Sequence, residues 1–507
     1  MYIKCYSSAI IGIEAIVITI EVNTSAGFKY HIVGLPDDAI KESEKRIEAA
    51  FLTNGFAMPH YKITVNLAPA NVKKEGSCYD LPIAIAILAA SSQIDPSKVD
   101  RYMMMGELLL DGTIGPIHGT LSMAMEAKRA GFEHIIVPLA NAQEAAVVNG
   151  LNVYGASSLM EVVLFLGGKG VIEPTVSEPF EMKINGSELL LDDFCDVKGQ
   201  EGVKRALEVA AAGGHNVLMI GSPGAGKTML AKRLCSILPK MTLAEALETT
   251  RVHSVAGKIG SEKGLITTRP FRSPHHTVSN VAIVGGGSNP QPGEISLANN
   301  GILFLDELPE FGRSVLEVLR EPLEERRITI SRARYSVNYP CNFMLVAAMN
   351  PCPCGYRLHS EKKCTCSQGD IRRYMHRISG PLLDRIDIHI EVMPVSYSEL
   401  TQRREGEKSN TIRERVTVAR DIQTERFRNE TIFSNAMMSS KQTEKYCPLD
   451  VTCKEILGRV IEKMGLSARA YHKILKLART IADLDRCADI ETRHLMEAIQ
   501  YRTLDRQ

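Results

Sequence analysis

The first 395 residues alternate between two hydrophobic patterns. Short runs rich in β-branched and aromatic residues predict strands, such as AIVITIEV, YKITVNL and HIIVPL. Between them lie segments that predict helices, such as IKESEKRIEAAFLTNG and LPIAIAILAASSQ. After residue 395 the pattern becomes helical and polar. The sequence therefore predicts an α/β fold followed by a helical lid.

A chain of 507 residues is too long for one hydrophobic core, so several domains are expected. Residues 1–166 predict a compact α/β domain, and residues 167–188, rich in Gly, Pro, Ser and Glu, predict a linker. In residues 189–395 the strand-like runs NVLMI, GILFLDE, NFMLVAAMN and RIDIHIEV alternate with helical segments, which favours a parallel sheet covered by helices. Residues 396–507 form the predicted lid.

Composition adds little about partners. The formal net charge is +1, so a nucleic-acid surface has to be a local patch. Glu14 interrupts the longest apolar run near the start, and no basic leader precedes it, so we expect a cytoplasmic protein without a membrane segment. Thiols are kept reduced in that compartment, which argues against a disulfide framework for the twelve cysteines.

A phosphate loop is the clearest chemical motif. GSPGAGKT follows the strand NVLMI and precedes the helix MLAKRLCSIL. Its glycines let the backbone N–H groups surround the phosphates, while Lys227 would reach the β- and γ-phosphates of ATP and Thr228 would bind Mg²⁺. The predicted nucleotide-binding residues are Gly221, Ser222, Pro223, Gly224, Ala225, Gly226, Lys227 and Thr228.

Two later strands deliver polar residues to the same edge of the predicted sheet. GILFLDE ends in Asp306 and Glu307, which would hold Mg²⁺ through water and polarise the attacking water, respectively. FMLVAAMN ends at Asn350, which would orient that water.

These motifs resemble those of AAA+ ATPases, with Walker A at 221–228, Walker B at 302–307 and sensor 1 at Asn350. Longer strings, among them SPHHTVSNVAIVGGG, PGEISLANNGILFLDELPEF and VAAMNPCPCG, are similar to the magnesium-chelatase-like ATPases of the ComM/YifB kind over essentially the whole chain. The resemblance implies that Arg385 is an arginine finger for a neighbouring subunit of a homo-hexamer, and that Arg469 is a sensor 2 arginine. Without it, an intrachain ion pair and a solvated helix face are the ordinary alternatives.

A basic segment, EERRITISRARYSVNYPCNF, predicts a β-hairpin before the sensor 1 strand. The family resemblance implies that this hairpin points into the ring's pore, where it would meet DNA phosphates without reading bases. The candidate DNA-binding residues are Arg326, Arg327, Arg332 and Arg334. Taken alone, a basic hairpin is equally typical of a solvated face. A glycine-rich insertion offers a second basic set, which could instead pack between subunits: Arg269, Arg272, His275 and His276.

Four cysteines follow sensor 1 as two CxC pairs: Cys352, Cys354, Cys364 and Cys366. Four thiolates at this spacing could hold a structural Zn²⁺ in a loop that has no apolar core of its own. The alternative is a set of unliganded reduced thiols, because zinc motifs more often use CxxC.

Residues 66–132 resemble the proteolytic domain of Lon, an S5 domain 2-like fold. The resemblance sets Cys78 at the nucleophile position, next to Ser77, and Leu121 where the activating lysine should be. Lys128 is two helical turns further on. We therefore expect a catalytically inactive domain used for assembly or partner binding.

Together, these features predict an ATP-dependent hexameric DNA motor that promotes branch migration in recombination, as the ComM resemblance implies for natural transformation. One alternative is a chelatase-type ATPase that inserts Mg²⁺ into a porphyrin, although the resemblance to chelatase subunits is expected to be confined to the ATPase core. A Lon-like protease is a further alternative, which Leu121 opposes.

Overall fold

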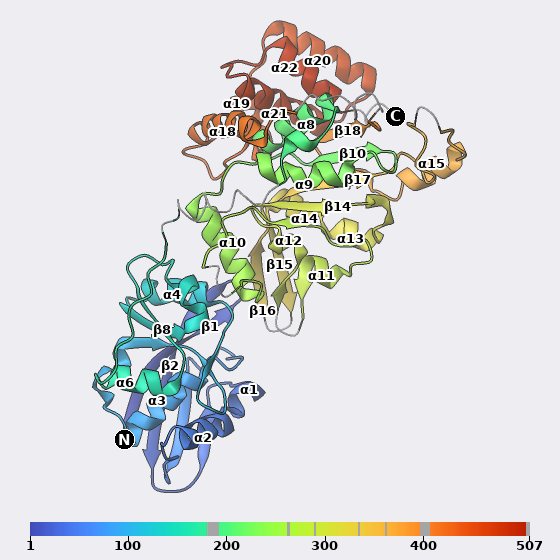
Figure 1. The fold of residues 1–507 in the computed structure, drawn as a ribbon. Helices are drawn as coiled ribbons and strands as arrows, with labels where there is room; N and C mark the ends of the chain where they lie inside the picture. Colours follow the sequence, from blue (N-terminus) through green and yellow to red (C-terminus); the bar gives the residue numbers. More distant parts are fainter. Residues whose placement is uncertain are drawn as a thin grey trace.

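The computed structural model describes residues 1–178, 180, 192–260, 264–287, 290–332, 335–359, 362–395 and 406–502. They form an elongated molecule (Figure 1), with an N-terminal lobe at one end, a parallel sheet in the middle and a group of helices at the other end. Within these residues no helix combines the length and the apolar character needed to cross a membrane.

The N-terminal lobe is built on a seven-stranded mixed sheet. In spatial order its strands are β3 (Tyr30–Val33), β4 (Lys62–Ala68), β2 (Glu14–Ser25), β1 (Tyr2–Ile11), β5 (Tyr102–Met104), β8 (His134–Pro138) and β9 (Asn152–Ala156). Its helices include α2 (Ser43–Thr53), α3 (Asp80–Ala90), α4 (Thr120–Arg129) and α6 (Leu159–Leu166). Every residue of α3 is buried, as expected for a helix that is apolar on all sides.

The predicted linker begins as part of this lobe. Ile172 is buried in the lobe's core, Pro174 bridges to Tyr154, and the N–H of Thr175 donates to Val153 O at 2.8 Å. Residues 181–188, at the end of the predicted linker, lie outside the described residues.

The central sheet contains five parallel strands: β11 (Phe271–Arg272), β14 (Ile302–Leu305), β17 (Met344–Met349), β10 (Val217–Gly221) and β18 (Ile388–Val392). Every residue of β10, β14 and β17 is buried, because helices or loops cover both faces of the sheet. The surrounding helices include α8 (Glu201–Gly213), α9 (Lys227–Ile237), α10 (Leu243–Val255), α13 (Arg313–Val318) and α14 (Arg320–Glu325).

A β-hairpin, β15 (Arg327–Arg332) and β16 (Tyr335–Pro340), follows α14. Side chains along the hairpin alternate between buried and exposed positions. Ile328, Ile330 and Val337 are buried, while Thr329 is exposed. The buried face joins the core beneath the central sheet, and the hairpin extends toward the N-terminal lobe (Figure 1).

Within residues 406–502, five α-helices complete the fold: α18 (Ser409–Arg426), α19 (Ser440–Tyr446), α20 (Val451–Met464), α21 (Ala468–Leu484) and α22 (Thr492–Gln500). One hydrophobic core contains residues of these helices and of the central sheet's other face, such as Ile474 with Val217. The helical lid therefore packs directly against the sheet.

The N-terminal lobe meets the central part through the β1–β2 turn and through contacts between α4 and α10. Ile13 in this turn is buried in the core beneath the central sheet. Arg251 of α10 donates to Ile13 O at 2.9 Å and pairs with Glu14 at 2.9 Å. Gly12 has a φ of +65°, and a Cβ there would lie 2.1 Å from Val337 Cγ1 of the hairpin.

Candidate ATP site and cysteine cluster

The phosphate loop joins β10 to α9 at the carboxyl edge of the central sheet. Gly224 and Gly226 have φ values of +78° and +88°, which favour glycine. Gly221 has no room for a side chain, because a Cβ there would lie 2.3 Å from Val392 O. The loop therefore has the tight curvature that lets backbone N–H groups face a phosphate.

Lys227 is buried inside this loop. Its ammonium donates to Gly221 O at 2.6 Å, to Ser222 O at 3.1 Å and to Asn350 Oδ1 at 3.2 Å. Burial lowers the pKa of Lys227, an effect that the Asp306 carboxylate opposes. A β- or γ-phosphate in the loop would exchange these neutral acceptors for a charged one.

The two carboxylates after β14 lie in different surroundings. The hydroxyl of Thr228 donates to Asp306 Oδ2 at 2.8 Å, so the two predicted Mg²⁺ contacts are adjacent. Glu307 adopts a left-handed conformation with φ of +53°, and its half-exposed side chain lies 3.7 Å from His276 Nδ1. A solvent-facing carboxylate beyond the metal position can polarise water.

Two contacts with the phosphate loop could not be predicted from a sequence motif. The side chain of Gln200, a left-handed residue before α8, donates to Ala225 O and to Met393 O, both at 3.0 Å. Gly355 packs so tightly on Pro223 that a Cβ would lie 2.6 Å from Pro223 Cδ. The cysteine-bearing loop thus rests on the phosphate loop.

Arg385 lies at the opposite edge of the sheet from the phosphate loop. It precedes β18, whose Ile388 pairs with Val217 and whose Val392 pairs with Gly221. The length of β10 alone, about 13 Å, separates the two edges. Arg385 NH2 contacts Glu324 Oε1 at 2.6 Å, and its NH1 donates to Pro381 O at 2.6 Å.

Arg469, near the start of α21, lies near the same edge. Its side chain is 61% exposed, and its NH1 is 3.8 Å from Asp384 Oδ2, next to Arg385. The two arginines that the family resemblance singled out are therefore neighbours, and the ion pair that Arg385 forms within the chain is with Glu324.

The four hairpin arginines do not share one environment. Arg326, at the end of α14, donates to Phe343 O at 2.6 Å at the base of the hairpin. Arg327 is 65% exposed and 3.4 Å from Glu325. The side chain of Arg332, together with all of Arg334, falls outside the described residues.

The basic residues of the glycine-rich insertion are largely engaged within the chain. Arg272 forms a two-pronged pair with Glu294 at 2.6 and 2.7 Å. Arg269 pairs with Glu245 at 3.1 Å and also donates to three carbonyl groups. His275 stacks near His276, with ring centroids 4.0 Å apart.

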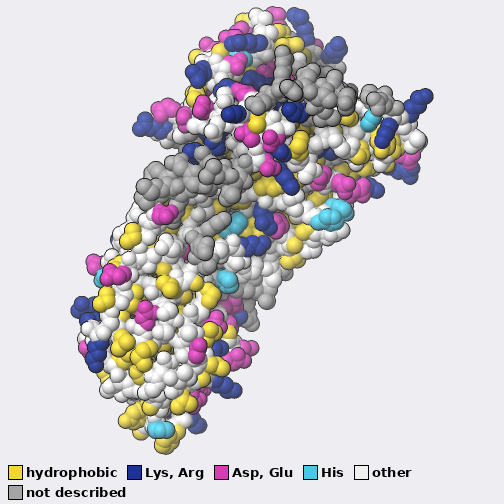
Figure 2. All heavy atoms as spheres, viewed as in Figure 1, with side chains coloured by type: hydrophobic (Ala, Val, Ile, Leu, Met, Phe, Trp, Pro, Cys, Tyr) yellow, Lys and Arg dark blue, Asp and Glu magenta, His cyan; other side chains and the backbone are white. Residues whose placement is uncertain are grey.

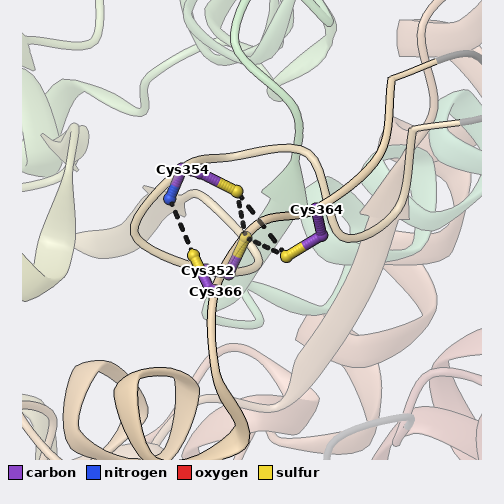
Figure 3. A group of neighbouring side chains, drawn as sticks. All are labelled: Cys352, Cys354, Cys364 and Cys366. Atoms are coloured by element: carbon purple, nitrogen blue, oxygen red, sulfur yellow. Dashed lines mark hydrogen bonds between the residues drawn. The ribbon is translucent and has the colours of Figure 1, made fainter.

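The four clustered cysteines converge in the loop after β17 (Figure 3). The sulfur of Cys352 lies 3.4 Å from that of Cys354 and 3.7 Å from that of Cys364, and the Cys354 and Cys364 sulfurs are 3.6 Å apart. The sulfur of Cys366 accepts the Cys354 N–H at 3.4 Å, and all four sulfurs lie within 4.8 Å of one another.

This spacing fits a tetrahedral metal. Zn–S bonds of about 2.3 Å imply sulfur–sulfur distances of about 3.8 Å. The N–H groups of Tyr356 and Thr365 lower the pKa of the Cys354 thiol to about 6, whereas burial raises the pKa of Cys352. The donor set, four soft sulfurs in a loop, suits Zn²⁺.

The N-terminal lobe lacks an activated nucleophile at the expected position. Burial raises the pKa of Cys78 to about 12, and Leu121 is fully buried. Lys128 lies at the C-terminal end of α4, where it donates to Gly150 O. A neutral, buried thiol is a poor nucleophile.

Comparison with known proteins identifies the relatives of this chain. The family model described as magnesium chelatase, subunit ChlI, matches residues 193–400, and its C-terminal counterpart matches residues 406–502. Competence protein ComM of Haemophilus influenzae is 45% identical over 506 residues, covering 99% of this chain and 97% of that protein. The uncharacterized protein YifB of Escherichia coli is 44% identical, with the same coverage.

The chain belongs to the ComM/YifB family of magnesium-chelatase-like AAA+ ATPases. Membership of this family makes the chain an ATPase that uses ATP with Mg²⁺. The α/β fold with a parallel sheet and C-terminal helices is the fold predicted from the sequence.

The expectation that the resemblance to chelatase subunits is confined to the ATPase core is wrong. A model described as subunit ChlI of Mg-chelatase also matches residues 20–141, so the chelatase resemblance extends into the N-terminal lobe. The 38 kDa magnesium-chelatase subunit of Rhodobacter capsulatus itself aligns over only 39% of this chain, at 26% identity. The similarity to Lon stays a prediction.

Proposed function

We propose that this ATPase is a hexameric DNA motor that promotes branch migration during recombination. The observation that carries the proposal is full-length similarity to a competence protein, combined with a basic hairpin directly before the sensor 1 strand. A role in competence would involve incoming DNA that has to be paired and exchanged. The ATP site would drive the hairpins of a ring along the DNA phosphates.

The arrangement of the two arginines supports a ring. Arg385 and Arg469 lie near the edge of the sheet opposite their own phosphate loop. From there, neither would reach the γ-phosphate of ATP bound in the chain's own loop. In a closed ring, that edge of one subunit would face the phosphate loop of the next, and both arginines would act on the neighbour's ATP.

Five residues of one chain and one of its neighbour would divide the chemistry at each site. Lys227 would bind the β- and γ-phosphates, Thr228 and Asp306 would hold the Mg²⁺ environment, and Glu307 would polarise water that Asn350 orients. Arg385 from the neighbour would stabilise charge that develops on the γ-phosphate.

Zinc is proposed as a structural element of this site. Cys352, Cys354, Cys364 and Cys366 would hold Zn²⁺, which ties the loop after sensor 1 into a fixed shape. Because Gly355 packs on Pro223, that shape would support the phosphate loop.

DNA binding would depend on exposed hairpin residues. Arg327 is the best-defined of these, since its side chain is largely exposed. Arg326, which donates to Phe343 O, would hold the hairpin's base. On the face drawn in Figure 2, basic and acidic side chains alternate, so the contact surface would be local, as the net charge of +1 predicts.

The chelatase alternative rests on the names of the matching family models. The full-length relatives favour the motor, since the chelatase subunit aligns over 39% of the chain. The protease alternative is opposed by the buried, neutral Cys78 and by Leu121.

The test is ATP-dependent migration of a labelled four-way DNA junction. We expect the wild-type protein to move the junction and Lys227→Ala to bind DNA without moving it. Arg327→Ala should reduce DNA-stimulated hydrolysis severalfold, while the control Arg428→Ala, an exposed arginine on the lid, should not. A wild-type protein whose hydrolysis ignores DNA and that leaves the junction intact would contradict the motor.

A further inference from the structure

The segment that carries Arg385 is held by the lid on both sides. This finger segment comprises residues 384–389, which enter β18. On one side of Arg385, Asp384 contacts Arg469 of α21 at 3.8 Å. On the other side, Ile386 O accepts from Arg502 at 2.7 Å.

Asp387 is the main attachment point. Lys473 of α21 lies 2.8 Å from Asp387 Oδ1, and Asp387 Oδ2 accepts from the Asn216 N–H at 3.0 Å. His215 lies 3.6 Å from the same carboxylate and contacts Thr480 of α21 at 2.8 Å. Burial alone would raise the pKa of Asp387, but Lys473 and His215 hold it well below its usual range, so the carboxylate is charged.

The end of the chain adds a short strand-like contact. The His389 N–H donates to Tyr501 O at 2.7 Å, and Arg502 pairs with His389 as a parallel bridge. Arg502 is 1% exposed and Asp387 is 8% exposed, so these contacts are shielded from water. Removing one partner of a buried ion pair is strongly destabilising, because it leaves an uncompensated charge away from water.

Among the described residues, no hydrogen bond or ion pair joins the Arg385 side chain to the lid. Its side chain contacts Glu324 and Pro381 O, and its carbonyl accepts from the Asn216 side chain at 3.0 Å. The lid thus fixes the backbone around Arg385 and leaves the guanidinium able to change partners.

We propose that Asp387, Lys473 and Arg502 form a clamp that makes the lid and the arginine finger move as one unit. They are positioning residues, because none of them contacts the phosphate loop. This inference rests on the proposed role of Arg385 in a ring. The movement of one subunit's lid would then set the finger against the ATP of the next subunit.

The test uses the full-length protein and a mixing assay. Lys473→Met combined with Asp387→Asn removes the ion pair without leaving a buried charge. We expect kcat for ATP hydrolysis to fall about tenfold, as for a weakened finger, while KM for ATP stays unchanged because the chain's own phosphate loop is intact. The single variant Lys473→Arg keeps a positive charge opposite Asp387, so its kcat for ATP hydrolysis should stay close to that of the wild type. The matched control is Lys476→Met, a lysine one turn along α21 that donates to Ala436 O instead.

Mixing separates positioning from a general loss of structure. Lys227→Ala subunits lack a working ATP site but carry an intact finger, so adding them to the clamp variant should raise hydrolysis severalfold above either protein alone. Unchanged kcat in the clamp variant, or a raised KM without rescue on mixing, would overturn the clamp. If the double variant does not fold, Asp387→Asn alone serves the same assay.

A second mixture, the reference pair of Arg385→Ala and Lys227→Ala, separates the proposed action of the finger across subunits from the proposed clamp. Arg385→Ala mixed with Lys227→Ala should also regain activity. If this pair regains activity and the clamp variant does not, only the clamp is wrong. If the reference pair fails as well, the finger's action across subunits and the clamp fall together.

Discussion

At the scale of single residues, the candidate site depends on side chains that hold one another in place. Lys227 donates to Asn350, and Thr228 donates to Asp306, so the loop and the two strand ends are already connected. Arg385 is also engaged, through Glu324. A finger that acts across subunits has to leave that partner.

Glu324→Gln should therefore favour the assembled, hydrolysing state. The Glu324 side chain is half-exposed, whereas the Arg385 side chain is only 11% exposed, so water screens the pair in part and the pair is of modest strength. We expect a gain in hydrolysis of about two- to fivefold at limiting protein concentration. The control is Glu325→Gln, whose carboxylate contacts Arg327 and not Arg385. Equal effects of the two substitutions would contradict competition for the finger.

Zinc binding is a second prediction at this scale. Cys352→Ser removes one of four converging sulfurs, and we expect the purified protein to lose most of its zinc and to unfold at a lower temperature. Metal content measured by plasma mass spectrometry is the readout. Cys195→Ser, outside the cluster, should keep its zinc. Wild-type protein without stoichiometric zinc would contradict the site.

At the scale of elements, strands and helices were predictable where their pattern is strong. NVLMI, FMLVAAMN and the helix after the phosphate loop formed as expected, because uninterrupted apolar runs between loop motifs suit a parallel sheet buried on both faces. The predicted linker was less accurate. Ile172 is an isolated apolar residue among Gly and Pro, and its burial depends on an edge of the sheet that the local sequence does not reveal.

The β1–β2 turn is the element through which the N-terminal lobe touches the hairpin. Gly12→Ala combines left-handed strain with a collision against Val337, so we expect a loss of about 1–3 kcal/mol beyond strain alone. Gly55→Ala is the matched control, because Gly55 has a φ of +77° and open space around its Cβ position. Thermal unfolding measures both. Similar losses in the two variants would mean that the contact with the hairpin is unimportant for stability.

At the scale of the whole molecule, the lid and the sheet share one core, and that interface contains a buried histidine. Burial lowers the pKa of His215 below its value of about 6.5 in an unfolded chain. As pH falls below about 6.5, the unfolded chain takes up the proton first, so the stability contributed by neutral His215 is complete above that pH and declines below it.

His215→Gln should therefore show a smaller fall in Tm between pH 7.5 and pH 5.5 than the wild type. Glutamine does not titrate, and the remaining groups are common to both proteins. His60→Gln, at an exposed position, should keep the wild-type pH dependence. Parallel Tm curves for the wild type and His215→Gln would contradict the linkage.

Ring formation is the last prediction at this scale. Glu307→Gln should bind ATP without hydrolysing it, because the carboxylate that polarises water is gone. Mass photometry with ATP should then detect six chains per particle, whereas the same variant without nucleotide should stay smaller at the same concentration. A monomeric Glu307→Gln protein at saturating ATP would contradict the ring.

The sequence by itself determined the residues of the phosphate loop, the two carboxylates after β14, the α/β fold and the cysteine pairs, since each depends on residue types at short, fixed spacing. Only the tertiary structure decided which residues surround them. Gln200, Glu324 and Lys473 lie 25, 61 and 86 residues from their partners Ala225, Arg385 and Asp387. Contacts over such separations follow from how the sheet, the hairpin and the lid pack, and packing has no periodic signature in the chain.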